Sequence, residues 1–135
     1  MKKILASGFL AGITLLILSY VVLYFTINFF PKLVEAYYDP IFWPGNDRAL
    51  LFFAHPFVLS FALAWFWDRF KDMFKGNLLI RGIEMGLVYG VIATLPSMWI
   101  TFSAIQVSLV MVLSWFAYGL LQATVAGLIF AKMNP

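Results

Sequence analysis

The chain of 135 residues is 64% hydrophobic, and only 11% of its residues are charged. Ordinary soluble domains are about 45–50% apolar and about 25% charged, so this composition argues against a soluble enzyme, a nucleic-acid-binding protein and a disordered tail. The chain contains no cysteine, which excludes disulfides and thiolate metal sites. We therefore expect an all-α membrane protein with a single transmembrane domain over residues 1–135.

Four apolar windows are long enough to cross a bilayer as helices, because about 20 apolar residues suffice. They cover residues 4–30, 49–67, 82–102 and 107–131. The first window is longer than the hydrocarbon core requires, so this helix is expected to tilt or to project from the membrane. Lys2 and Lys3 precede it and no small-residue cleavage site follows it, which is typical of an uncleaved signal anchor. The sequence thus predicts a four-transmembrane-helix bundle.

The Lys and Arg residues are divided unequally between the two sides of the predicted bundle. Seven lie at one set of helix ends: Lys2, Lys3, Arg69, Lys71, Lys75, Arg81 and Lys132. Only Lys32 and Arg48 lie on the other side. Because Lys and Arg are concentrated on the cytoplasmic side of membrane proteins, both the N and the C terminus are predicted to be cytoplasmic. The small size and four-span layout favour the inner membrane of a bacterium as the location.

Residues 31–48 form the long outer loop. Pro31 suits a first helical position, and residues 32–38 could form two short helical turns. Turn signals follow at Asp39–Pro40 and at residues 43–46. Aromatic residues typical of a membrane–water interface are Tyr37, Tyr38, Phe42 and Trp43. We expect this loop to lie on the outer surface of the membrane.

Residues 68–77 are predicted to continue the second helix into the cytoplasm as an amphipathic segment. Trp67, Phe70 and Phe74 recur on one helix face, whereas charged residues occupy the rest of the surface. A segment of this kind rests in the headgroup layer. Positive-inside anchoring is the simpler interpretation, and binding of anionic lipid is the alternative.

The connection between the third and fourth windows, around residues 96–106, carries no charge and is predicted to be a tight helical hairpin. Pro96 lacks a backbone N–H group, so it either kinks or ends the third helix. A short hairpin makes the third and fourth helices neighbours in the bundle.

Small residues recur every four positions in these two helices. The third window contains Gly82, Gly86 and Gly90, and the fourth contains Gly119, Ala123 and Gly127. Residues four apart share one helix face, and small side chains there let two helix backbones approach closely within a membrane. The pattern favours close packing of the third and fourth helices within one chain, and a dimer interface is the alternative.

Ionisable residues inside a membrane are costly and are therefore functional candidates. Glu84 lies one turn inside the third window, and Arg81 precedes it by three residues, so the two can form an interfacial ion pair. The alternative is that Glu84 is a proton or cation site, as in small multidrug transporters. Those proteins place the carboxylate deep in the first helix, which does not match the position of Glu84.

Two further polar candidates are His55 and Gln122. His55 is the single histidine, and Pro56 follows it in the outer half of the second window. A structural role is the simpler interpretation; a metal site or a pH-responsive outer gate would need the outer carboxylates as partners. Gln122 lies midway along the fourth window, where it would hydrogen-bond across a helix interface or line a polar path.

The residues carry no catalytic motif, because no nucleophile, base and orienting group occur in a recognisable pattern. We expect no enzyme activity, no cofactor and no nucleic-acid partner. The expected function is that of a helical scaffold or subunit that associates with other membrane helices. The alternatives are a homo-oligomeric channel or carrier for small solutes or ions, and a binder of lipids or apolar ligands. The expected partners are membrane lipids and either a second copy or another membrane protein.

Overall fold

The computed structural model describes residues 1–42 and 45–135, so Trp43 and Pro44, part of the predicted outer turn and aromatic belt, lie outside the described residues. The described residues form helices and turns without any strand. Four helices are long and apolar enough to cross a membrane: Lys2–Phe29, Asn46–Met73, Leu78–Ala104 and Leu109–Met133. The prediction of an all-helical chain with four helices long and apolar enough to span a membrane is confirmed.

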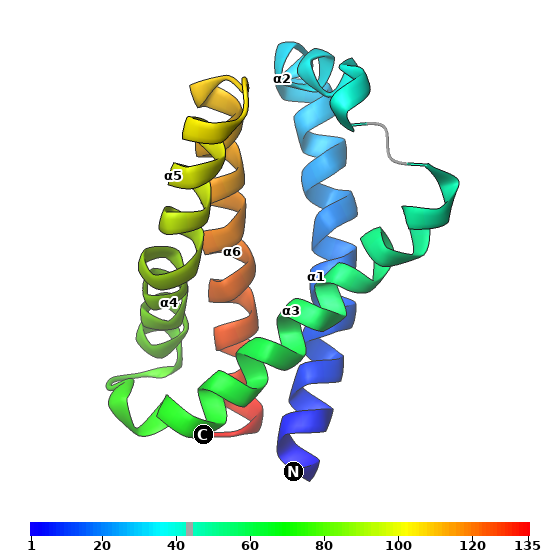
Figure 1. Ribbon diagram of the computed structural model, residues 1–135. Helices are drawn as coiled ribbons and strands as arrows, with labels where there is room; N and C mark the ends of the chain where they lie inside the picture. The colour runs from blue at the N-terminus through cyan, green and yellow to red at the C-terminus, as the bar shows by residue number, and fades with distance from the viewer. Residues whose placement is uncertain (43–44) are drawn as a thin grey trace.

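The four long helices form two antiparallel pairs (Figure 1). One pair consists of α1 (Lys2–Phe29) and α3 (Ala49–Phe70), which cross each other. In the other pair, α6 (Leu109–Met133) runs beside α4 (Leu78–Tyr89) and α5 (Leu95–Ala104). Contacts between α1 and α6 join the two pairs. The N and C termini lie at the same end of the molecule.

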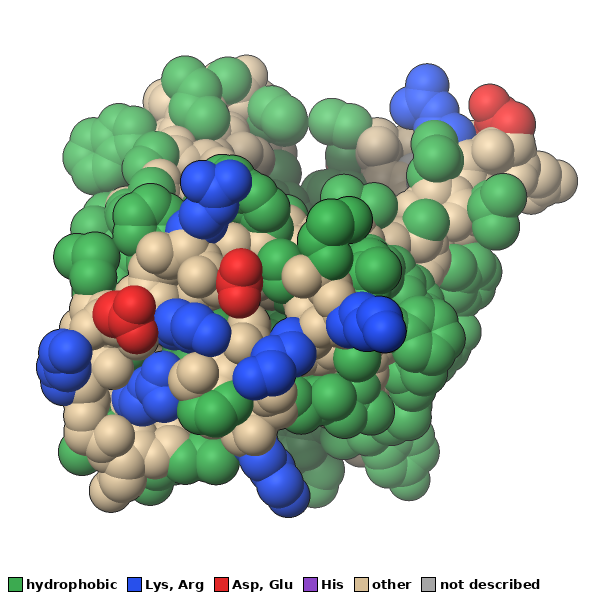
Figure 2. Space-filling model, turned by 90° about the horizontal axis from the view of Figure 1, so that it is seen from below, with side chains coloured by type: hydrophobic (Ala, Val, Ile, Leu, Met, Phe, Trp, Pro, Cys, Tyr) green, Lys and Arg blue, Asp and Glu red, His purple; other side chains and the backbone are tan. Residues whose placement is uncertain are grey.

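Most of the basic side chains gather at the end that carries both termini. Seen from below, this face shows many Lys and Arg side chains with a few carboxylates among them (Figure 2). We call it the basic end, and it comprises the start of α1, the end of α3, the start of α4 and the end of α6. The Lys and Arg residues that are unequally distributed along the sequence therefore concentrate at one end of the folded molecule.

The third long helix changes its hydrogen-bonding pattern partway along but does not end there. A π-helical turn at Gly90–Thr94 separates α4 from α5, and Pro96 lies in the first turn of α5. Proline has no N–H group to donate to the preceding turn of the helix. The wider π-turn directly before Pro96 accommodates this missing hydrogen bond. Pro96 therefore does not end the helix, which continues to Ala104. The hairpin then turns into α6, where the Ser108 side chain accepts a hydrogen bond from the Met111 N–H at 3.2 Å.

The predicted helical continuation over residues 68–77 is correct only as far as Met73. The α-helix α3 ends at Phe70, and a 3-10 turn, η4, covers Lys71–Met73. The chain then reverses at Gly76, whose φ of +102° is readily adopted only by glycine. Phe74 is buried and stacks on Trp67 with ring centroids 5.2 Å apart. Burial of this ring against the indole outweighs the periodicity that favoured a longer helix.

At the opposite end, the outer loop forms short helical turns. They are α2 (Pro31–Glu35), with proline in its first turn, followed by η1 (Ala36–Tyr38), η2 (Pro40–Phe42) and η3 (Asn46–Arg48). Asp39 accepts a hydrogen bond from the Ile41 N–H at 3.0 Å, which fixes the turn after η1. The loop is attached to α6 through Trp115, whose indole N–H donates to the Tyr37 hydroxyl.

Packing between α1 and α3 is tighter toward the basic end. The buried residues of α1 all lie between Ser7 and Leu15, and those of α3 all lie between Pro56 and Trp67. No residue of α5 is buried. The helices of the first pair therefore pack closely over their basic halves and expose apolar side chains over their outer halves.

Candidate functional site at the basic end

A polar clamp joins the C-terminal residues to the end of α3. The indole N–H of Trp67 donates to the backbone carbonyl of Asn134 at 2.8 Å, and both residues are buried. Phe130, one turn earlier on α6, also packs on the indole, with ring centroids 6.2 Å apart. A buried indole N–H requires a partner, and the last turn of α6 supplies it.

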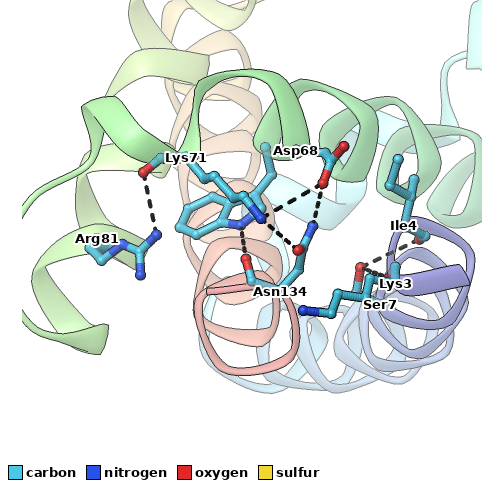
Figure 3. A network of polar contacts seen from close by, with 8 residues as sticks. Lys3, Ile4, Ser7, Asp68, Lys71, Arg81 and Asn134 are labelled. Atoms are coloured by element: carbon cyan, nitrogen blue, oxygen red, sulfur yellow. Dashed lines mark hydrogen bonds and ion pairs between the residues drawn. The ribbon is translucent and has the colours of Figure 1, made fainter. Parts of the chain in front are cut away.

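The Asn134 side chain extends this clamp to two charged residues of the same α3 terminus (Figure 3). Its amide nitrogen donates to Asp68 at 2.8 Å, and its amide oxygen accepts from the Lys71 ammonium group at 2.8 Å. Lys71 and Asp68 also lie 3.9 Å apart as an ion pair. One asparagine thus satisfies a carboxylate and an ammonium group together, which fixes the end of α6 against α3.

Arg81 contacts residues of the clamp and does not pair with Glu84. Its guanidinium lies over the Trp67 ring, 4.9 Å from the centroid, and donates to the Lys71 carbonyl at 3.3 Å. This places a cation on an aromatic face that is shielded from water. In the described part of the chain, no ion pair within 4.0 Å joins Arg81 to Glu84, so the predicted interfacial pair does not form.

Glu84 instead borders an apolar groove between the end of α3 and α4. The groove has a volume of about 650 Å³ and is lined by Phe66, Phe70, Met73, Phe74, Glu84, Leu87, Val88 and Ile92. Glu84 accepts a hydrogen bond from the Lys75 backbone N–H at 3.2 Å, which holds the carboxylate near the turn at Gly76. The Asn77 side chain caps α4 by accepting from the Ile80 N–H at 3.0 Å, and this cap sets where the helix that carries Glu84 begins.

The small residues of the two repeats lie where α6 packs against α4 and the π-turn. A Cβ atom on Gly86 would lie 3.1 Å from the Leu120 carbonyl, and one on Gly127 would lie 3.1 Å from the Gly82 backbone. A Cβ atom on Gly119 would meet Thr94 at 3.0 Å, and the adjacent Ala123 is completely buried. Gly90 similarly faces Leu120. The close approach therefore lies within one chain, and we call this interface the α4–α6 seam.

Gln122 is buried beside this seam, with 5% of its surface exposed. It lies one turn from Tyr118 on α6, and the Thr94 side chain lies opposite α6 on the π-turn. The hydroxyl oxygens of Thr94 and Tyr118 are buried without a hydrogen-bond partner among the described residues. The structure thus brings polar groups to the middle of the bundle, although no ionisable residue of the basic end reaches them.

His55 is exposed on α3, directly before Pro56. Within residues 1–42 and 45–135, no group of three His, Cys, Asp or Glu side chains is close enough to hold a metal ion. A separate pocket of about 410 Å³ lies beneath the outer loop. Two carboxylates, Glu35 and Asp39, line it together with Gln106 and Ser108 of the hairpin. Sequence analysis did not connect these four residues, because the two segments meet only in the folded chain.

Comparisons with known proteins leave the geometry as the basis for assigning a role. No family model, no curated protein and no solved structure matches this chain. The contact that sequence analysis missed is the hydrogen bond between Trp67 and Asn134, which lie 67 residues apart. The sequence carries no periodic or motif signal that would pair them.

Proposed function

We propose that this chain is a non-catalytic membrane protein of the bacterial inner membrane, with both termini in the cytoplasm, and that it acts as a helical scaffold for other membrane helices. The basic end would then face the cytoplasm, as the positive-inside rule requires. The clamp and the α4–α6 seam would hold the four helices in a fixed arrangement. The exposed faces of α1 and α5 would be available to partner helices.

The main observation behind this proposal is that most serine and threonine hydroxyls within the long helices bond to their own backbone. Ser7, Thr14, Ser19, Thr26, Ser60, Ser97, Thr101 and Ser114 each donate to a carbonyl three or four residues earlier in the same helix. Such a hydroxyl uses its single hydrogen within its own helix, so it has no donor left for a solute. This favours a structural role over that of a channel or carrier.

The faces available to partners lie where the chain does not cover itself. On α1, Tyr24 is 72% exposed, and on α5, Trp99 is 76% exposed. Lipid surrounds such faces in an isolated protein, and helix association would replace lipid contacts by side-chain packing. Partner contacts are therefore expected on the outer halves of α1 and α5, away from the clamp.

Photocrosslinking tests this assignment. A photoreactive amino acid at Tyr24 or Trp99 should give discrete protein adducts in native membranes, whereas the same probe at Leu79, 57% exposed near the basic end, should give lipid adducts. The partner would be identified by mass spectrometry, and the adduct must be reproduced with the two purified proteins. Lipid adducts alone at all three positions would overturn the scaffold assignment.

A flux assay tests the channel or carrier alternative. Liposomes containing the purified protein should leak protons, potassium and chloride no faster than empty liposomes. Flux above this level that is abolished by Gln122→Leu or Glu84→Gln would replace the scaffold with a transport function.

The groove beside Glu84 favours a second candidate function, namely binding of a lipid or apolar ligand. Its lining is almost entirely apolar, with Glu84 as the one charged residue. This candidate is compatible with a scaffold, because the groove lies beside α4 and away from the outer halves of α1 and α5.

A further inference from the structure

We propose that the groove between α3 and α4 binds an aminophospholipid, with its primary ammonium on Glu84 and an acyl chain along the apolar wall. This inference rests on the second candidate function, binding of an apolar ligand, and adds the chemical class of that ligand. Three features of the groove support it: an uncompensated carboxylate, an aromatic wall and a lysine beside the carboxylate.

The carboxylate of Glu84 is the one charged group among the residues that line the groove. In the part of the chain that the structure describes, no Lys or Arg side-chain nitrogen forms an ion pair with it within 4.0 Å. The nearest cation in sequence, Arg81, is held on the Trp67 ring and by the Lys71 carbonyl. A partly buried carboxylate at an apolar site is stabilised by a cation, and a ligand ammonium would supply that charge.

The apolar walls of the groove can contact the hydrocarbon part of such a ligand. Phe66, Phe70 and Phe74 come from the α3 side, while Leu87, Val88 and Ile92 come from α4 and the π-turn. Aromatic faces attract an ammonium group, and the aliphatic strip offers contact to a hydrocarbon chain. The volume of about 650 Å³ admits one acyl chain with the inner part of a headgroup.

Lys75 completes the charge complementarity. Its backbone N–H donates to Glu84, so the backbone of this exposed lysine lies next to the carboxylate. A zwitterionic headgroup with one ammonium and one phosphate places a positive and a negative charge a few bonds apart. Glu84 and Lys75 present the opposite pair, which matches an aminophospholipid better than an anionic lipid or a neutral apolar molecule.

Lipid binding to the purified full-length protein tests the proposal, with retained lipid counted by native mass spectrometry. The probes are phosphatidylethanolamine, its N-acylated form without the positive charge, phosphatidylglycerol, and the free lipophilic cation tetraphenylphosphonium. Phosphatidylethanolamine should bind roughly tenfold or more tightly than the N-acylated lipid, because a charge-assisted hydrogen bond is lost in the latter. Tighter binding of tetraphenylphosphonium or phosphatidylglycerol than of phosphatidylethanolamine would overturn the assigned occupant.

Two pairs of variants separate the parts of the proposal. Glu84→Gln should abolish the preference for the charged headgroup, whereas Asp72→Asn, which removes an exposed carboxylate that does not line the groove, should preserve it. Leu87→Trp should fill the groove and weaken binding of every lipid, whereas Ile83→Trp, on an exposed position outside the groove, should not. Circular dichroism of each variant must match that of the parent.

The outcomes distinguish this inference from the function on which it rests. Equal binding of charged and N-acylated lipid, with both weakened by Leu87→Trp, would overturn ammonium recognition but support an apolar-ligand site. Lipid retention that no variant changes would overturn both. Loss of preference in Glu84→Gln together with weakened binding in Leu87→Trp is the expected result.

Discussion

The indole N–H of Trp67 donates a hydrogen bond to the main-chain carbonyl of Asn134 at 2.8 Å, and this contact joins the end of the second long helix to the end of the fourth. The bond is buried, so water cannot replace either partner. Around it lie the stacked ring of Phe74 and the guanidinium of Arg81. The basic end is therefore held by a specific polar arrangement as well as by apolar packing.

Loss of the indole donor should destabilise the protein. We expect Trp67→Phe to lower the free energy of unfolding by about 1–3 kcal/mol, because the Asn134 carbonyl would remain buried without its partner. Trp65→Phe is the matched control, since Trp65 is 54% exposed. Thermal unfolding in detergent, followed by circular dichroism, measures both variants. Equal unfolding temperatures for the two would show that the clamp contributes little.

Close approach of α4 and α6 should depend on Gly86. Gly86→Leu is expected to destabilise the fold by about 1–3 kcal/mol or more, because its first side-chain carbon would lie 3.1 Å from the Leu120 carbonyl. Leu87→Ala, at a position 56% exposed, should change stability by only about 0.5 kcal/mol. Thermal unfolding in detergent measures the stability of both variants. If Gly86→Leu unfolds like the parent protein, the seam does not require a small residue there.

The buried hydroxyl of Thr94 should be dispensable. Its oxygen has no hydrogen-bond partner among the described residues, so Thr94→Val removes an unsatisfied group and should raise stability by about 1 kcal/mol. In Thr101→Val, the lost hydroxyl donates to the Ser97 carbonyl at 2.7 Å, and stability should fall by about 0.5–1.5 kcal/mol. The same unfolding assay applies. A destabilised Thr94→Val would indicate that bound water satisfies this hydroxyl inside the bundle.

Residues 39 and 75 should lie on opposite sides of the membrane. Both positions are exposed, one in the outer loop and one at the basic end. Asp39→Cys should react with an impermeant thiol reagent added to intact cells, whereas Lys75→Cys should react only after the membrane is opened. The parent chain has no cysteine, so each label reports a single position. Labelling of both variants from the same side would contradict the proposed topology.

Much of the architecture was predictable from local sequence features. Long, mainly apolar stretches produce the four long helices, since a helix satisfies its own backbone groups without contributions from distant residues. Four-residue spacing of Gly82, Gly86 and Gly90 places these residues on one helix face. The unequal distribution of Lys and Arg likewise anticipates the separation of charge between the two ends.

The arrangement at the basic end was decided by tertiary structure. Arg81 could have paired with Glu84 on the same helix, but it lies over Trp67, and Glu84 borders the groove instead. Which partner a long side chain meets depends on where other helices end, because contacts such as Trp67 to Asn134 join residues 67 positions apart. Composition and periodicity act over one or two helical turns, so they determine the helices, whereas the contacts among helix ends arise only when all four are packed together.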